Sequence, residues 1–261
     1  MRLAILIKRL FYQVLCNPVT GTVIAKLFGN KIPNLRNPRE RWYVTDSGMS
    51  RSIMASIFFG FYEAAEIRFV RKYFDGSIDA IELGSSCGIV SSHIISKFKE
   101  PERKYIGVEA NKLLAKAFWQ NAKRGNKSAA LMRLLNVAVD YSGASVLFSF
   151  SENTTASKVV VEGSIVSERA QQVPSMTLDA IVRENNVNKF ALFCDIEGAE
   201  IQILSLETEV WEHCMQIFIE LHETDYRQKR HTVEMLHRMV IQKGYSLVDQ
   251  NGPVRHYLRK I

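Results

Sequence analysis

The chain has 261 residues, a mass of 29.8 kDa and a net charge of +7. That length suits one large α/β domain with an extension, or two small domains. Hydrophobic residues make up 47% of the chain and charged residues 23%, which excludes a disordered protein. The longest apolar run near the start, Leu3 to Ile7, is too short for a signal peptide or a membrane span. Four cysteines without CxxC or zinc spacing indicate reduced thiols and a cytoplasmic protein.

The excess positive charge lies in the first third of the chain. Residues 1–78 contain 12 Lys and Arg against 5 Asp and Glu, whereas the remaining residues contain 22 of each kind. A basic segment can contact a nucleic acid or an anionic membrane, or can simply be a solvated surface. The charge distribution alone leaves these three interpretations open.

The N-terminal residues have the spacing of an amphipathic helix. Its apolar face consists of Leu3, Leu6, Ile7, Leu10 and Val14. Such a helix could lie peripherally on a membrane, or pack on its own domain or on a partner subunit. Residues 17–50, which include three prolines, are predicted to be irregular. We therefore predict a basic extension over residues 1–57, followed by the main domain over residues 58–261.

Strands and helices alternate along the main domain. A helix over residues 58–73 leads into it, and a hairpin at Asn251 and Gly252 closes it. Strands are predicted at 78–84, 104–110, 131–139, 189–195 and 215–223, helices at 89–98, 112–124, 177–185, 200–206 and 232–244, an antiparallel strand at 143–150 and a loop over 151–174. This alternation predicts a doubly wound, mostly parallel α/β sheet with helices on both faces and one antiparallel edge strand.

The first candidate site is the stretch "IELGSSCG", which ends the first strand of the domain. Ligands of doubly wound sheets bind beyond the carboxyl ends of the strands, where the strand order reverses. Gly84 would let the backbone bend under a ligand, and Gly88 would let the next helix pack closely. Glu109 ends the second strand 21 residues past Gly88, which is the place for a carboxylate that accepts ribose hydroxyls.

The residues of this loop favour one nucleoside over others. A dinucleotide fingerprint would need glycine at 84, 86 and 89, but the chain has Ser86 and Ile89, and it contains no P-loop pattern. Glu82 would repel a pyrophosphate, whereas it suits the ammonium and sulfonium of S-adenosylmethionine. A simple strand–helix turn is the alternative. The predicted cofactor-binding residues are Glu82, Gly84, Ser85, Ser86, Gly88, Glu109, Asn136 and Asp195.

The second candidate site is "FALFCDIEGAE", residues 190–200. An uncharged strand is followed at once by Asp195, Glu197 and Glu200. Because this strand would lie beside the first one, Asp195 would emerge close to the methyl-bearing sulfur. Alternatively, Asp195 and Glu200 only cap the helix that follows.

These motifs together resemble a known family. "KFALFCDIEGAEIQIL" is similar to the signature of FkbM-type methyltransferases, in which a strand ends in D-x-E-G-x-E, and "SMTLDAIV", "NVAVDYSGASVLF", "YEAAEIRFV" and "IELGSSCG" match further elements over roughly residues 58–224. The family usually has aspartate at Glu82, asparagine at Ser86 and often lysine at Cys194. The resemblance implies a class I, Rossmann-like fold that binds S-adenosylmethionine and, most often, O-methylates sugars or other secondary metabolites.

Methyl transfer to a hydroxyl requires a base within hydrogen-bond reach. Asp195 is one candidate, and "FIELHET" adds Glu220 and His222. An unperturbed histidine titrates near pH 6.5, although a histidine at a strand end is often structural. The same three side chains could bind a divalent metal, but no spacing rule supports it.

The expected acceptor is a small molecule or a glycan, and an oligomer is compatible with the sequence. An RNA or protein methyltransferase that grips its substrate through the basic N-terminal third is one alternative. The chain lacks the Asn/Asp-Pro-Pro-aromatic element of amino-group methylation, and phosphates would meet three acids at residues 195–200, which argues against nucleic acid. The other alternative is a non-catalytic scaffold protein. The presence of a complete set of site residues argues against it: Gly84, Gly88, Glu109 and Asp195.

Overall fold

The structure is a computed structural model, and it describes residues 12–45, 49–149, 158–159 and 170–260. Most of the predicted amphipathic helix, from Leu3 to Leu10, lies outside the described residues, while Val14 of the same face is 69% exposed. Within the described ranges, no helix has both the length and the apolar character needed to cross a bilayer. All four cysteines are buried free thiols.

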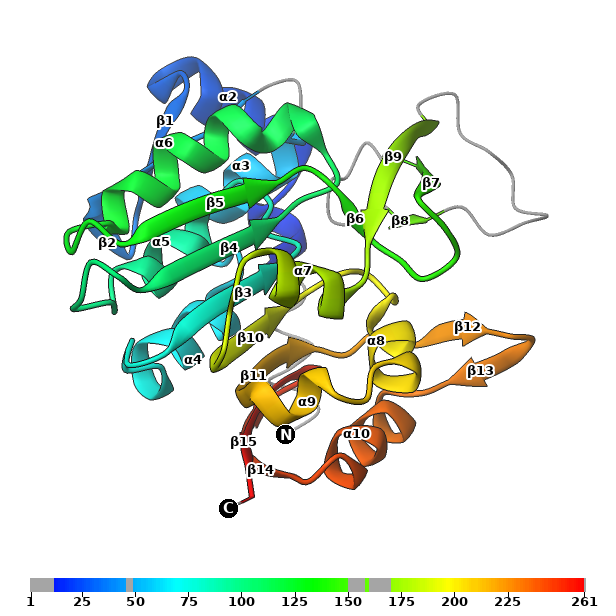
Figure 1. Cartoon of the computed structure of the whole chain (residues 1–261). Helices are drawn as coiled ribbons and strands as arrows, with labels where there is room; N and C mark the ends of the chain where they lie inside the picture. The colour runs from blue at the N-terminus through cyan, green and yellow to red at the C-terminus, as the bar shows by residue number, and fades with distance from the viewer. Residues whose placement is uncertain (1–11, 46–48, 150–157, 160–169, 261) are drawn as a thin grey trace.

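The main sheet has seven strands in the order β14-β15-β11-β10-β3-β4-β5 (Figure 1). Their bounds are β3 Asp79–Leu83, β4 Lys104–Val108, β5 Leu131–Leu135, β10 Phe190–Cys194, β11 Cys214–Glu220, β14 Tyr245–Asn251 and β15 Val254–Arg259. Strands β3, β4, β5, β10 and β11 pair in parallel, whereas β15 is antiparallel to both of its neighbours. This confirms the predicted mostly parallel sheet. The antiparallel strand is β15, and β14 lies outside it at the edge.

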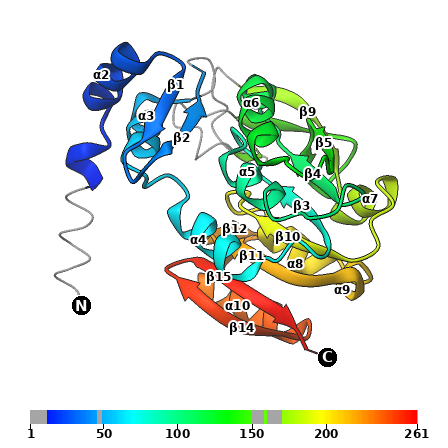
Figure 2. The ribbon, with the colours of Figure 1, turned by 90° about the vertical axis from the view of Figure 1, so that its left-hand side faces the viewer.

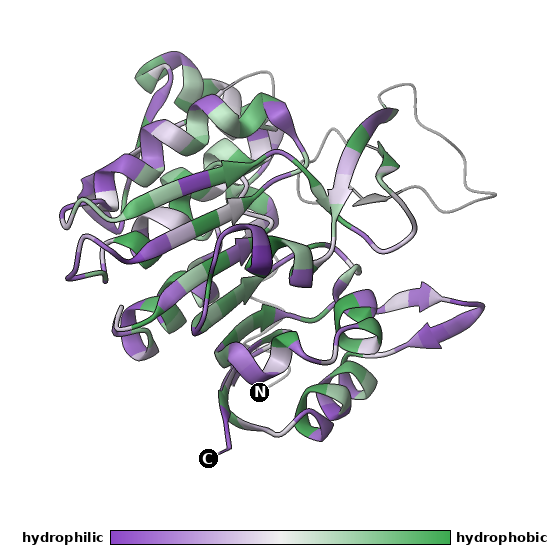
Figure 3. Ribbon diagram, in the orientation of Figure 1, coloured by the Kyte–Doolittle hydropathy of each residue, from purple (hydrophilic) through white to green (hydrophobic). Residues whose placement is uncertain are grey.

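Helices cover both faces of this sheet (Figure 2). One face carries α4 Ala64–Tyr73, α5 Ile89–Ile95 and α6 Ala115–Gly125, which η1 Lys112–Leu114 precedes; the other carries α7 Leu178–Glu184, α8 Glu200–Leu206, α9 Val210–His213 and α10 Val233–Gln242. The alternation of strand side chains explains the two layers. In β3, Ile81 packs toward α7–α10 and Ala80 toward α4–α6, and both are fully buried. Strands at the centre of the sheet, such as β10, are apolar because helices cover them on both faces (Figure 3).

A second, smaller sheet has the order β6-β9-β7-β8. Its strands are β6 Ala138–Val139, β7 Ser145–Ser149, β8 Lys158–Val159 and β9 Ala170–Met176. The antiparallel strand predicted at 143–150 is therefore present, but it pairs with β9 rather than with the main sheet. The loop predicted over 151–174 ends sooner than expected, because β9 already begins at Ala170. A hairpin of β12 Thr224–Tyr226 and β13 Lys229–His231 follows β11.

The prediction that residues 17–50 are irregular is wrong. The structure has helix α2 Pro18–Phe28 and a hairpin of β1 Lys31–Asn34 and β2 Asn37–Tyr43. The Asn17 side chain accepts a hydrogen bond from the Thr20 amide at 2.9 Å, and Pro18 occupies the first turn. A proline at that position starts a helix instead of breaking it, since its missing amide is not needed there.

The helix predicted over 58–73 is also interrupted. Helix α3 spans Arg51–Phe58, and α4 begins only at Ala64. Between them, Gly60 and Glu63 have positive φ angles of 68° and 46°, which end one helix and redirect the chain into the next. The extension packs against α5 and α6 through a shared core that includes Ile32, Met54, Cys87, Ile89 and Ala117. The division into residues 1–57 and 58–261 stays a prediction.

Candidate functional site

The loop after β3 is a tight turn that two glycines make possible. Gly84 has a φ of +84°, and a Cβ atom there would lie 1.9 Å from the carbonyl oxygen of Asp195. Gly88 has a φ of +80°, and its Cβ would lie 2.8 Å from the carbonyl oxygen of Phe118 in α6. Gly88 thus permits the close helix packing that the sequence suggested. Gly84 permits something else, namely the contact between the loop and the end of β10.

Glu109 holds this loop from the end of β4. Its Oε2 accepts a hydrogen bond from the Ser86 amide at 2.8 Å, and its Oε1 accepts one from the Asn111 amide at 2.7 Å. The Asn136 side chain donates to the Glu109 carbonyl oxygen at 2.7 Å and so braces the same strand end. Burial raises the pKa of Glu109, and the two amide hydrogen bonds oppose that rise. Three of the predicted cofactor-binding residues, Ser86, Glu109 and Asn136, are therefore brought together.

Glu82 occupies a different setting from the one expected. It is 5% exposed, and its Oε2 accepts hydrogen bonds from the Ser91 hydroxyl at 2.5 Å and from the Tyr105 hydroxyl. Burial raises the pKa of Glu82 to about 8, against the effect of these two hydrogen bonds. A carboxyl group with that pKa is mostly protonated at neutral pH. The structure thus places Glu82 beneath the loop, where two hydroxyl groups orient its carboxyl group, and its part in cofactor binding stays a prediction.

The loop after β3 has a buried hydroxyl group, on Ser85, that a nucleoside cofactor could bind. Ser85 is 3% exposed, and its buried hydroxyl has no hydrogen-bond partner among the described residues. Tyr62 closes the other side of the loop, where its hydroxyl lies 3.0 Å from the Ser86 hydroxyl. An unsatisfied buried hydroxyl beside a glycine turn and a strand-end carboxylate is what a bound polar ligand would complete. Ser85, Ser86 and Glu109 would hold S-adenosylmethionine here.

The acidic stretch after β10 packs directly behind this loop. The Asp195 amide donates to the Leu83 carbonyl at 3.0 Å, so the end of β10 is fixed to the end of β3. The Asp195 side chain is 31% exposed, yet its Oδ1 is buried and has no hydrogen-bond partner among the described residues. Burial and then the charge of Glu220 raise the pKa of Asp195 well above its usual value, while His222 opposes the rise.

His222 lies at the centre of four carboxylates. Its Nδ1 is 3.0 Å from Glu200 Oε1, and its Nε2 lies 3.6 to 3.8 Å from the nearest oxygens of Asp195, Glu197 and Glu220. Burial alone would lower the pKa of His222, but the hydrogen bond and charge of Glu200, with the charges of Asp195 and Glu220, raise it to about 9. At neutral pH the ring is therefore an imidazolium, and the predicted candidates Asp195, Glu220 and His222 form one cluster.

Glu200 has a structural part in this cluster. It is fully buried at the start of α8, where its Oε1 accepts from the Ile196 amide at 3.2 Å and contacts His222. This agrees with the alternative that Glu200 serves the helix that follows. Its second oxygen, Oε2, is buried without a hydrogen-bond partner among the described residues. Asp195, Glu200 and His222 place ligand atoms within 4.8 Å of one another, which suits a metal ion, yet the imidazolium already supplies positive charge there. A divalent metal thus remains an unsupported option.

Two further acids, Glu63 and Glu66, were missed as members of this site. Together with Glu82, Asp195 and Glu220 they line a narrow cavity of about 30 Å³ at the carboxyl edge of the sheet. Burial, followed by the neighbouring Glu220, raises the pKa of Glu66 to about 7. The two glutamates stood in the "YEAAEIRFV" element, where their spacing of three residues on a helix start was the available signal.

Comparison with known proteins identifies the class of protein to which this site belongs. The sequence profile of the "Methyltransferase FkbM domain" matches residues 84–247. The chain belongs to the FkbM methyltransferase family, and S-adenosyl-L-methionine is the cofactor of this class of enzyme. This confirms the predicted family. No curated protein matches the chain.

Three solved structures are similar to the chain at low sequence identity. An FkbM methyltransferase from Methylobacillus flagellatus has 15% identity and a TM-score of 0.44, over 82% of this chain and 55% of that one. A protein of the NADB-Rossmann superfamily from Streptococcus agalactiae has 12% identity and a TM-score of 0.40, over 74% and 65%. A Streptococcus pneumoniae protein assigned as a tRNA (m1A22) methyltransferase, in complex with S-adenosyl-L-methionine, has 11% identity and a TM-score of 0.39, over 74% and 70%. The chain thus spans less than two thirds of the length of the first and second of these proteins.

Proposed function

We propose that the protein O-methylates a hydroxyl group of a sugar, a glycan or a related small molecule, with Asp195 as the general base. The observation that carries this proposal is the position of Asp195. Its backbone contacts Gly84 of the cofactor loop, its Oδ1 is buried without a partner among the described residues, and burial raises its pKa. A carboxylate whose pKa is raised toward the working pH is a better base than an ordinary aspartate.

The chemistry of the transfer assigns each neighbour a task. S-adenosylmethionine, when bound, supplies a methyl group on a positively charged sulfur. The Asp195 carboxylate would accept the proton of the acceptor hydroxyl as that oxygen takes the methyl group, whose former bonding electron pair would stay on the sulfur. Burial and the charge of Glu220 raise the pKa of Asp195, and the His222 imidazolium limits that rise. His222 is therefore a positioning residue, because a ring with a pKa of about 9 is already protonated at neutral pH.

The acidic surroundings support a neutral hydroxyl as the acceptor group. Asp195, Glu197, Glu200 and Glu220 all lie around one imidazole. A phosphate at the reacting position would be repelled by these carboxylates, whereas a hydroxyl would lose only a proton to them. A cationic sulfonium would also be favoured over its neutral product.

The test is methyl transfer from labelled S-adenosylmethionine to a panel of sugars, glycans, small phenols and RNA. We expect transfer to a hydroxyl of a sugar or glycan. The Asp195→Asn variant should lower turnover on that acceptor by about 10²-fold or more, the usual effect of losing a general base. The affinity of this variant for S-adenosylhomocysteine, measured by calorimetry, should stay within about threefold of the wild-type value. A lost hydrogen bond between Asp195 and the cofactor would instead weaken binding roughly tenfold.

The matched control is Asp225→Asn, which removes an aspartate that is 71% exposed on the β12–β13 hairpin. It should leave turnover unchanged. If Asp195→Asn kept wild-type turnover, or if RNA were the only methylated member of the panel, the proposal would be wrong.

A further inference from the structure

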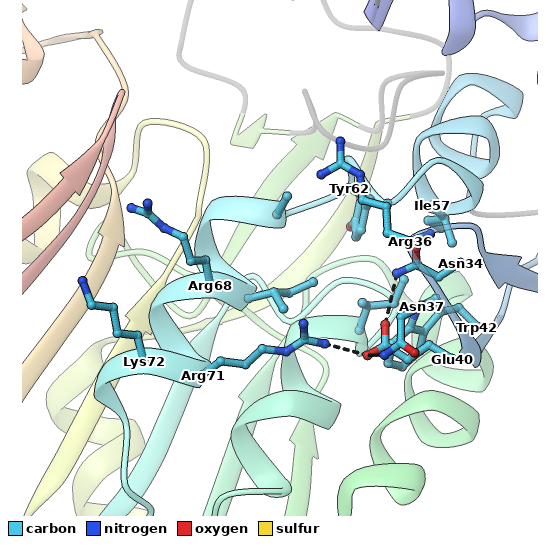
Figure 4. A pocket seen from close by; sticks show the side chains of 14 residues that line it. Asn34, Arg36, Asn37, Glu40, Trp42, Ile57, Tyr62, Arg68, Arg71 and Lys72 are labelled. Carbon is cyan, nitrogen blue, oxygen red and sulfur yellow. Dashed lines mark hydrogen bonds and ion pairs between the residues drawn. The ribbon is translucent and has the colours of Figure 1, made fainter.

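A second, larger cleft lies outside the methyl-transfer centre. It has a volume of about 460 Å³, within the usual range for small-molecule sites, and lies between the β1–β2 hairpin and the outer side of α4 (Figure 4). Thirteen of its fourteen lining residues precede residue 84, where the match to the FkbM domain begins, and Ile89 is the exception. Most of the lining therefore lies outside the residues that the FkbM profile matches, although α4 belongs to the segment that resembles the family in sequence.

Positive charge dominates the lining. Arg36 reaches the cleft from the hairpin, and Arg68, Arg71 and Lys72 reach it from α4. Glu40 is the one acid that lines it within the described part of the chain. Much of the excess charge in residues 1–78 is thus gathered at one concave surface. A flat anionic membrane would not fill such a hollow, but a small anion would.

Glu40, the one acid among the described residues of the lining, already accepts three hydrogen bonds. Glu40 accepts hydrogen bonds from Arg71 at 2.6 Å, from the Asn37 side chain at 2.8 Å and from the Asn34 side chain at 3.0 Å. Glu40 thus holds Arg71 in place without cancelling the other cations. Arg68 and Lys72 lie 3.7 and 3.4 Å from Asp249, which does not line the cleft.

Arg36 is the least compensated of these cations. Among the residues that the structure describes, no carboxylate lies within 4.0 Å of it, and its guanidinium stands 4.5 Å from the centre of the Phe61 ring. An exposed arginine held on an aromatic face keeps its fork of N–H donors available. Guanidinium groups bind phosphate oxygens in pairs of parallel hydrogen bonds, so this donor set suits a phosphate better than a lone carboxylate.

Helix α4 separates this cleft from the methyl-transfer centre. Glu63 and Glu66 line the narrow acidic cavity, whereas Ala64, Ile67 and Arg68 line the cleft. The two sites therefore lie on opposite sides of one helix, which with its side chains is about 10–12 Å across. We propose that the cleft binds a small phosphate-bearing molecule, such as a sugar phosphate, at a site separate from the methyl-transfer centre.

The test is calorimetric titration of the full-length protein with inorganic pyrophosphate, and with glucose 1-phosphate against glucose. We expect saturable binding of both phosphate compounds and none of glucose. The Arg36→Gln/Arg68→Gln double variant should bind pyrophosphate at least about tenfold more weakly, because it loses the charge-assisted hydrogen bonds of two guanidinium groups. Its affinity for S-adenosylhomocysteine should be unchanged, which shows that the fold and the cofactor site are intact.

The matched control is Arg183→Gln/Arg230→Gln, which removes the same charge at two arginines that are 74% and 57% exposed on α7 and β13. It should bind pyrophosphate like the wild type. Equal weakening in this control would show a nonspecific charge effect and would overturn the proposal. So would the absence of saturable binding, or tighter binding of single-stranded RNA or phosphatidylserine vesicles through Arg36 and Arg68. None of these results depends on whether the protein transfers a methyl group.

Discussion

The methyl-transfer centre around Asp195 and His222 and the basic cleft differ in how their charged side chains are buried. In the centre, the carboxylates of Asp195 and Glu200 each have a buried oxygen without a hydrogen-bond partner among the described residues, and they share one imidazolium. In the cleft, Arg68, Arg71 and Lys72 are about half exposed or more. Buried charges interact strongly and shift one another's pKa, whereas water screens exposed ones. The centre therefore suits proton transfer, and the cleft suits recognition of an anion.

Helix α4 is the element that keeps these two environments apart. Its start presents Glu66 to the cavity beside Asp195, and its last turn presents Arg71 and Lys72 to the cleft. This order also matches the helix dipole, which favours acids at the N-terminus and bases at the C-terminus. The residues of one helix therefore place acidic side chains at the methyl-transfer centre and basic side chains at the cleft.

The largest effect should come from disturbing the acidic centre at its backbone. Gly84→Ala would bring a Cβ atom to 1.9 Å from the Asp195 carbonyl oxygen, at a residue with a φ of +84°. Left-handed strain in a residue other than glycine costs about 1–3 kcal/mol, and overpacking costs about as much again. We expect the free energy of unfolding to fall by at least about 2 kcal/mol, measured by urea denaturation, with loss of S-adenosylhomocysteine binding.

The control for this substitution is Gly143→Ala. A Cβ atom at Gly143 would meet nothing within 4 Å, and the residue has no positive φ. Its free energy of unfolding should change by no more than about 1 kcal/mol, in the stabilising direction if at all. Equal losses in both variants would show that the contact between Gly84 and Asp195 does not hold the centre together.

A smaller and pH-dependent effect should follow from removing the imidazolium. Because the pKa of His222 in the folded state, about 9, lies above its unfolded value near 6.5, its protonated form stabilises the fold. That contribution is fully present below pH 6.5 and is lost as the pH rises through 9. The difference in free energy of unfolding between wild type and His222→Gln should therefore shrink from pH 6.5 to 9. A pH-independent difference between wild type and His222→Gln would contradict the assignment of an imidazolium.

The strength of local signals decides how much of the fold could be predicted. Strands such as β10, buried along its whole length, were recognisable because a short uncharged run bounded by turns is typical of a strand covered on both faces. The prediction for residues 17–50 fails because Pro18 and Pro33 do not break the elements in which they lie. Pro18 instead follows the cap Asn17, and Pro33 lies in the two-stranded hairpin β1–β2, where only one neighbour requires amide donors.

The sequence predicted which residues of single segments belong to the site, but not which segments meet there. Asp195, Glu220 and His222 were proposed from their strand ends, and the parallel sheet brings such ends together. The contribution of Glu63 and Glu66 depends on the turn between α3 and α4, and the pKa of His222 depends on Glu200 and Asp195 after β10 and on Glu220 at the end of β11. The basic cleft depends on contacts between the hairpin and α4. No pattern in one segment specifies such a meeting of segments.

The smallest effect should come from the ion pair that shapes the basic cleft. Arg71 and Glu40 are 2.6 Å apart, but the Arg71 side chain is 51% exposed. Although the Glu40 side chain is only 17% exposed, water already solvates the half-exposed guanidinium, so we expect the pair to contribute about 0.2–1 kcal/mol. A double-mutant cycle with Arg71→Gln and Glu40→Gln should give a coupling energy in that range by urea denaturation, similar to the exposed Arg183–Asp179 pair at 2.7 Å. A coupling energy above about 2 kcal/mol would place the pair among buried interactions, and the contrast between a strongly coupled centre and a weakly coupled cleft would fail.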